Sequence, residues 1–113
     1  MKDFMLVFRA DYNNMRAGTP EEREAMSKRW MEWIHGIAAQ NRLADRGNRL
    51  NLTGKVIRSG QVVTDGPYAE IKEAIGGFTI IKAESYEEAV ELAKPCPIIT
   101  IGGNVEVREI ALL

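Results

Sequence analysis

The stretch VTDGPY at residues 63–68, followed by IGGF at residues 75–78, joins an apolar strand to a rigid turn and then enters a second apolar strand. Asp65 and Gly66 are typical of a turn, because an Asp side chain can accept a hydrogen bond from the backbone ahead of it and Gly tolerates a positive φ. The proline that follows favours extended geometry at the residue before it. The pattern predicts a turn that holds the carboxylate of Asp65 and the phenol of Tyr68 near a strand end, either as part of a site or as structure alone.

The length and charge of the chain restrict the class of protein. Its 113 residues suffice for one core, so residues 1–113 are expected to form a single domain. A formal net charge of −1 provides no basic field for phosphates, which argues against nonspecific nucleic-acid binding. The N-terminal apolar run, residues 4–8, is too short for a membrane span or a signal sequence. Because the single cysteine, Cys96, cannot form an internal disulfide, we expect a cytoplasmic protein.

The sequence carries no motif of the common cofactor-dependent enzymes. It has no Walker A loop, no GxGxxG and no GxSxG. It has one histidine and no Cys/His cluster with the spacing of metal ligands. We therefore expect no cofactor and no metal site.

Two segments begin with helix-start signals. Thr19 can cap a helix, with a proline at the next position and a glutamate three residues on, and this helix is expected to reach about residue 41. Ser85 begins a second capping box, and its helix is expected to end at Lys94. The core face of the first helix is an apolar stripe at helical periodicity, formed by Met26, Trp30, Trp33, Ile34 and Ile37.

Two features of the first helix bear on function. Trp30 and Trp33 belong to the core or line a pocket. His35 falls nearly opposite the centre of the apolar stripe, so it is expected at the solvent or at a dimer rim rather than as a general base.

The remaining segments predict strands at residues 4–8, 55–58, 61–64, 77–83 and 105–110. The Ser59–Gly60 pair predicts a hairpin between the second and third of these. Residues 43–52 fit a strand or a loop, and residues 70–74 fit a short helical turn. The order of elements predicts an α+β fold, a ferredoxin-like split βαβ sandwich with an extra hairpin.

Two helices can cover only one face of the predicted sheet. Met5 and Val7 contribute apolar side chains to the other face, which then needs a cover. A homodimer with its sheets packed face to face is the economical answer. The predicted partner is therefore a second copy of the chain.

A set of short motifs spans nearly the whole chain: FML at 4–6, TDGPYAE at 64–70, KE at 72–73, GGF at 76–78, EEA at 87–89, CP at 96–97 and GNVEVR at 103–108. With them the chain resembles the YCII-related family, specifically its DGPF branch, with Tyr68 in place of the phenylalanine of the branch name. The resemblance implies a dimeric α/β barrel of ferredoxin-like subunits, in a superfamily with small-molecule isomerases, dehalogenating enzymes and monooxygenases. Branch members also occur beside or fused to sigma-factor-like regulators, so the resemblance leaves a non-enzymatic role open.

This chain departs from its relatives at the residues presumed to be catalytic. Better studied YCII-like proteins carry a histidine on the first helix and an aspartate in a DP motif after the second. When the comparison is anchored at residues 41–43, Trp30 stands at the histidine position and Cys96 at the aspartate position. The resemblance therefore does not carry a histidine–aspartate mechanism to this chain.

Several residues are candidates for a site. Asp65 is the candidate acid/base residue or a turn residue only, and Tyr68 could donate a hydrogen bond to a ligand. Arg108 and Glu106 lie on one side of the last strand and are candidate ligand-binding residues. Either Arg108 holds a carboxylate-bearing ligand beside Glu106, or the two form an exposed ion pair. Arg9 follows the first strand with the same parity as Met5 and Val7, so its side chain is expected to reach the same cavity as Arg108 and Glu106.

One further candidate, Cys96, is a reactive thiol or a buried apolar group. We expect a domain that binds a small anionic organic molecule in a cleft between the sheet and a covering element. Any chemistry would be cofactor-free acid/base catalysis of the isomerase or lyase kind, with Asp65 as base. The alternative is a non-catalytic regulatory or protein-interaction module.

Overall fold

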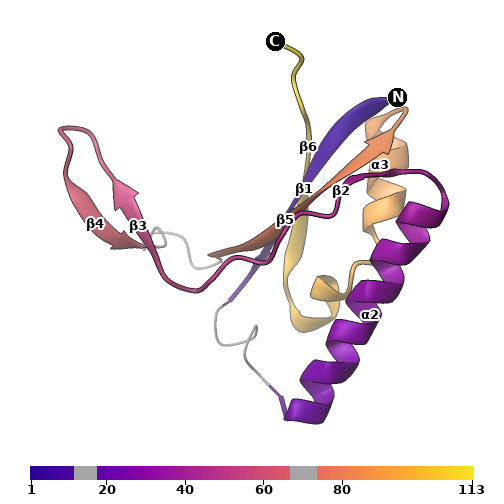
Figure 1. Cartoon of the computed structure of the whole chain (residues 1–113), viewed down its shortest axis with the longest axis horizontal. Helices are drawn as coiled ribbons and strands as arrows, with labels where there is room; N and C mark the ends of the chain where they lie inside the picture. Colours follow the sequence, from indigo (N-terminus) through magenta and orange to yellow (C-terminus); the bar gives the residue numbers. More distant parts are fainter. Residues whose placement is uncertain (12–17, 67–73) are drawn as a thin grey trace.

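The computed structural model describes residues 1–11, 18–66 and 74–113. In chain order its elements are β1 (Lys2–Ala10), α2 (Pro20–Ala39), β2 (Leu43–Asp45), β3 (Gly54–Ile57), β4 (Val63–Gly66), β5 (Ala74–Ala83), α3 (Tyr86–Ala93), the short 3₁₀ helix η1 (Pro97–Ile101) and β6 (Asn104–Glu109). An antiparallel sheet runs in the order β2-β5-β1-β6, and β3 and β4 form a separate hairpin. Both helices lie on one side of the four-stranded sheet (Figure 1). The predicted ferredoxin-like α+β fold with an extra hairpin is confirmed.

Both predicted helices begin at their caps. The Thr19 hydroxyl accepts a hydrogen bond from the Glu22 N–H at 3.1 Å, and the Ser85 hydroxyl accepts one from the Glu88 N–H at 3.2 Å. Helix α2 ends at Ala39 rather than at residue 41, because Asn41 takes a left-handed φ of 57° that a helix cannot continue.

The alternation of β1 divides the sheet into two faces. Phe4, Leu6 and Phe8 are buried under the helices, whereas Met5 and Val7 on the other side are only half-buried. Between α2 and α3, the indole N–H of Trp33 donates to the Leu92 carbonyl at 2.9 Å. The core therefore lies between the sheet and the helices.

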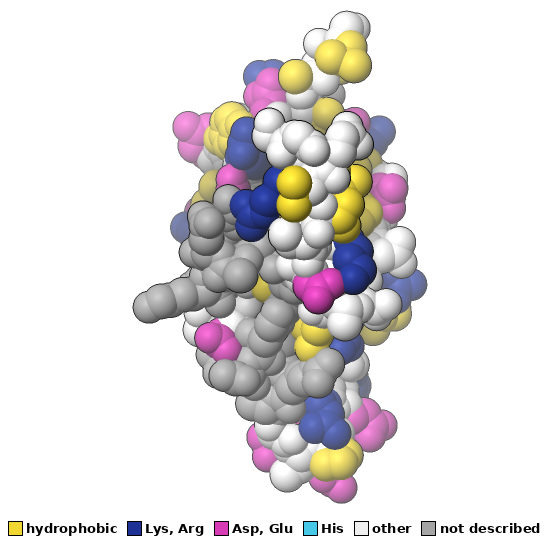
Figure 2. Space-filling model, turned by 90° about the vertical axis from the view of Figure 1, so that its left-hand side faces the viewer, with side chains coloured by type: hydrophobic (Ala, Val, Ile, Leu, Met, Phe, Trp, Pro, Cys, Tyr) yellow, Lys and Arg dark blue, Asp and Glu magenta, His cyan; other side chains and the backbone are white. Residues whose placement is uncertain are grey.

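We call the side of the four-stranded sheet away from the helices the open face. Met5, Val7 and Ile80 lie on it, half-buried. The β3–β4 hairpin projects on this same side (Figure 1). Seen from that side, the surface mixes hydrophobic, basic and acidic side chains (Figure 2). The radius of gyration, 15.4 Å, exceeds the roughly 13 Å expected for a compact domain of about this length, as a projecting hairpin requires.

The hairpin around Gly60 forms as predicted. Gly60 and Gln61 take positive φ values of 82° and 68°, and the Arg58 N–H donates to the Val62 carbonyl at 2.6 Å. The structure corrects the placement of Asp65 and Gly66, which lie within β4 and not in a turn. The neighbouring strand explains why a glycine suits this position, since a Cβ on Gly66 would lie 3.1 Å from a side-chain methyl group of Val56 and 3.3 Å from the backbone carbonyl carbon of Gly54.

Three other segments can be compared with expectation. Of residues 43–52, only Leu43–Asp45 forms a strand, and Arg49 adds an isolated bridge to Gly77. The predicted helical turn at 70–74 lies outside the described residues except for Ala74, which begins β5. Helix η1 was not predicted. No helix in the described ranges combines the length and apolar character needed to cross a bilayer, and a cytoplasmic location stays a prediction.

Candidate functional site

A cleft opens between the first half of α2, the segment of residues 46–52 and the start of β5. We call it the helix–sheet cleft, and it has a volume of about 620 Å³. Its floor consists of buried residues from four elements: Phe8, Ile34, Thr79 and Ile98. Concave, mostly apolar spaces of this size are the usual form of small-molecule sites.

Trp30 forms the aromatic wall of the cleft. It is half-buried, and its ring meets the Phe8 ring edge-to-face with centroids 4.9 Å apart. Among the described residues, none accepts a hydrogen bond from the Trp30 indole N–H, whereas Trp33 has its carbonyl acceptor. Of the two tryptophans considered for a pocket, Trp30 therefore lines the cleft and Trp33 belongs to the core.

Two glycines allow the opposite wall, residues 46–52, to lie directly against β5. Gly47 has a φ of +70°, and a Cβ there would lie 1.7 Å from the Phe78 carbonyl oxygen. A Cβ on Gly77 would lie 2.8 Å from the Asn48 carbonyl oxygen. That oxygen accepts a hydrogen bond from the Phe78 N–H at 3.3 Å, so the wall is tied to the sheet.

Three arginines line the cleft near its opening. Arg23 donates to the Gly18 carbonyl at 2.9 Å, and Arg46 contacts the sulfur of Met31 at 3.1 Å, so both meet uncharged acceptors. The side chain of Arg49 has no hydrogen-bond or ion-pair partner within the described part of the chain. The cleft thus offers positive charge that no neighbouring carboxylate in these ranges neutralises directly.

Glu22 is the carboxylate among the described lining residues. Its side chain accepts from the Thr19 hydroxyl at 3.3 Å, as part of the cap of α2. No histidine, cysteine or lysine lines the cleft in the ranges the structure describes. The arrangement can therefore bind a ligand by apolar contact and by arginine contacts.

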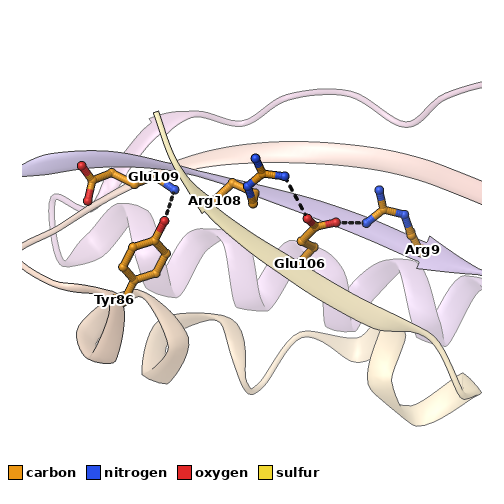
Figure 3. A network of polar contacts seen from close by, with 5 residues as sticks. All are labelled: Arg9, Tyr86, Glu106, Arg108 and Glu109. Atoms are coloured by element: carbon orange, nitrogen blue, oxygen red, sulfur yellow. Dashed lines mark hydrogen bonds and ion pairs between the residues drawn. The ribbon is translucent and has the colours of Figure 1, made fainter. Parts of the chain in front are cut away.

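The predicted residues Arg9, Glu106 and Arg108 come together on the open face (Figure 3). Glu106 pairs with Val7 across β1 and β6, which sets it on the side away from the cleft. Arg9 donates to one carboxylate oxygen, and Arg108 donates to the other at 3.1 Å. These hydrogen bonds, that of Arg9 first, lower the pKa of Glu106. On the helix side of β6, the Tyr86 hydroxyl accepts from the Glu109 N–H at 2.8 Å (Figure 3).

The other predicted site residues lie elsewhere. Asp65 is on the projecting hairpin, with 89% of its side chain exposed and an ion pair to Lys55, so one chain does not bring it to the arginine cluster (Figure 1). Tyr68 lies outside the described residues. The roles of Asp65, Tyr68 and the arginine cluster in binding or catalysis stay predictions.

The structure places His35 and Cys96, two residues for which the sequence left more than one interpretation. His35 is exposed on α2, as expected from its position opposite the apolar stripe. Cys96 is buried, and burial raises the pKa of its thiol to about 12. It therefore belongs to the core, the second of the two interpretations considered.

The wall of residues 46–52 and its arginines were not predicted from the sequence. The signal that could have indicated it is the pair of glycines at Gly47 and Gly77, because glycine within a strand pattern often marks a close backbone approach. Nothing in the local sequence pairs these two positions, since they meet only in the folded sheet.

The chain is thus a ferredoxin-like α+β domain with an apolar cleft and arginines at its opening. It belongs to the YCII-related family, because the model of the YCII-related domain matches residues 4–112. No curated protein matches the sequence. Among solved structures, one similar chain is 5-chloro-2-hydroxyhydroquinone dehydrochlorinase (TftG) from Burkholderia phenoliruptrix AC1100, in complex with 2,5-dihydroxybenzoquinone. It is 18% identical, the alignment covers 96% of this chain and 93% of that chain, and the TM-score is 0.45.

Proposed function

We propose that the protein binds a small organic molecule in the helix–sheet cleft. The observation that carries the proposal is a cleft of about 620 Å³ whose floor is made of core residues and whose wall is a half-buried tryptophan. A ligand seated there would cover the exposed part of Trp30. Covering apolar surface is favourable by about 25 cal/mol per Å².

We propose binding as the function and keep acid/base catalysis as a narrower hypothesis. A general base must come within hydrogen-bond reach of the proton that it removes. Glu22 is already engaged at the helix cap, and Asp65 is on the hairpin. Isomerase or lyase chemistry with Asp65 as base would therefore require the hairpin to move or to come from a second chain.

The experiment that tests binding blocks the cleft from an exposed position. Ser27 lines the cleft on the surface of α2, so Ser27→Phe is expected to obstruct part of it without disturbing the core. A thermal-shift screen of neutral and charged aromatic compounds should raise the midpoint of the wild type and not that of the variant. The matched control is Ala38→Phe, at an exposed position of the same helix away from the cleft.

The proposal fails if no compound shifts the wild type, or if Ser27→Phe responds as the wild type does. A response that Ala38→Phe keeps and Ser27→Phe loses supports the cleft as the site. Turnover of any compound that binds would then test the acid/base hypothesis directly.

We also propose that a second copy of the chain covers the open face. Two observations favour this interaction role. Met5, Val7 and Ile80 form an apolar strip on the open face, and no helix of the described residues lies over it. On the hairpin that projects on the same side, Ile57 and Val63 pair directly and are 71% and 58% exposed. A lone two-stranded hairpin is marginally stable in water, so a partner that packs on it would stabilise it.

A further inference from the structure

We infer that the helix–sheet cleft selects an aromatic carboxylate, with Arg49 as the residue that binds its charge and Trp30 as the residue that packs on its ring. The inference rests on the proposed binding function and narrows it to one class of ligand. It concerns the cleft alone and is independent of the arginine cluster on the open face.

The first support is the balance of charge at the opening. Arg23, Arg46 and Arg49 line the cleft, and Glu22 is the carboxylate that faces them among the described residues. Because Glu22 is bonded within the helix cap, its charge stays at the start of α2. An anion at the opening would therefore meet an excess of positive charge beside an apolar floor, where electrostatic attraction is stronger than in bulk water.

The second support is the position of Arg49. Its backbone is fixed to β5 by the bridge to Gly77, and its neighbour Leu50 donates its N–H to the Gly76 carbonyl at 2.9 Å. The side chain has no partner in the described part of the chain, whereas Arg23 and Arg46 each have one. An arginine on a fixed backbone with an unused guanidinium matches a carboxylate, which it can bind through two parallel hydrogen bonds.

The third support is the aromatic wall. Trp30, Phe8 and Trp33 form a cluster of edge-to-face contacts, with centroids between 4.9 and 5.8 Å apart. Trp30 is the half-buried member of the cluster, and no described residue accepts a hydrogen bond from its indole N–H. A ligand ring that packs on it would extend this cluster, because aromatic rings prefer such offset or edge contacts.

The experiment compares pairs of ligands that differ in charge but hardly in shape. Isothermal titration calorimetry is used with benzoate against benzamide, and with 1-naphthoate against 1-naphthamide. The wild type should bind each carboxylate about tenfold more tightly than its amide, as a charge-assisted hydrogen bond implies. Added salt should weaken the binding of the carboxylate and leave the binding of the amide unchanged.

Arg49→Gln should remove the preference for the carboxylate. The affinity for the carboxylate should fall about tenfold, while the affinity for the amide changes less than about twofold. The matched control is Arg29→Gln, an exposed arginine of α2 that does not line the cleft, and it should keep the preference. Trp30→Leu should weaken both members of each pair by the same factor, because it removes ring contact and no charge.

The possible failures separate the two proposals. If amides and carboxylates bind equally, or neutral compounds bind and carboxylates do not, the inference is wrong and the binding function stands. If the preference survives in Arg49→Gln, the role of Arg49 is wrong. If nothing in the thermal-shift screen or the calorimetry binds the wild type, the binding function itself is wrong.

Discussion

Single residues show how burial and contact, rather than residue type, decide chemical character. Cys96 and Glu106 both carry side chains that can take part in chemistry. The thiol of Cys96 is buried in the core, however, and the carboxylate of Glu106 is bound by two arginines. The sequence could not distinguish these outcomes for Cys96, because its burial depends on η1 and the core around it. By contrast, the alternation of side chains along β1 and β6 was sufficient to predict that Arg9, Glu106 and Arg108 lie on the same side of the sheet, because that alternation is a local property of each strand.

The thiol of Cys96 is expected to be inert in the folded protein. With a pKa of about 12, only about one thiol in ten thousand is ionised at pH 8, and the side chain is buried. A disulfide reagent such as DTNB should therefore react slowly until denaturant is added. Ser59→Cys, which places a thiol on the exposed hairpin turn, should react at once with one equivalent. Rapid reaction of the wild type at pH 8 would contradict the burial of Cys96.

The Glu106 carboxylate should make stability depend on pH in one direction. Its pKa in the folded protein lies below the ordinary value of 4.5, so the ionised form is favoured by folding. The stabilisation is fully present above that ordinary value and is lost as the pH falls through the lowered pKa. The melting temperature of the wild type should exceed that of Glu106→Gln at pH 7, and the difference should shrink below about pH 4.5.

The matched control for this measurement is Glu24→Gln, at an exposed position of α2 with no ion pair among the described residues. It should give no comparable pH-dependent difference. A gap between wild type and Glu106→Gln that stays constant down to pH 3 would contradict the proposed cause.

Elements differ in how far their own sequence determines them. Helices α2 and α3 could be predicted because their caps at Thr19 and Ser85 lie within a few residues of their starts. The wall of residues 46–52 could not, because its path depends on Gly77, which lies far along the chain. Asp65 was misplaced for a related reason, since an Asp-Gly pair is typical of a turn but here lies in a strand opposite Gly54 and Lys55.

The close approach at Gly77 gives a prediction at this scale. Gly77→Ala puts a methyl group 2.8 Å from the Asn48 carbonyl oxygen, so the wall must shift. We expect a loss of about 1–2 kcal/mol in the free energy of unfolding, measured by denaturant titration, and weaker binding in the cleft. Gly36→Ala is the matched control, because no atom lies within 4 Å of the added Cβ on α2, and it should stabilise by up to about 1 kcal/mol. Equal effects of the two changes would contradict the close approach.

Within the described ranges, the four-stranded sheet has one face covered by both helices and one face that no helix covers. That division was predictable from the count of helices and the double-sided apolar pattern of β1, whereas the position of the cleft was not. The proposed second copy is tested by light scattering after size exclusion. The wild type should show twice the mass of one chain, and Met5→Lys on the open face should show a single chain. Val90→Lys, on the exposed side of α3, should keep the mass of the wild type. A wild type of single-chain mass at micromolar concentration would contradict the proposal.

Strand β1 contributes to both faces of the sheet. Phe8 lines the cleft, and Arg9, the next residue, lies on the open face. Adjacent positions along one extended segment therefore serve two separate surfaces. In two copies stacked by their open faces, each cleft would stay on the helix side of its own sheet, away from the contact between the copies. Each entrance would then fill without waiting for the other, and a titration of the assembled pair should follow a simple hyperbola with one dissociation constant.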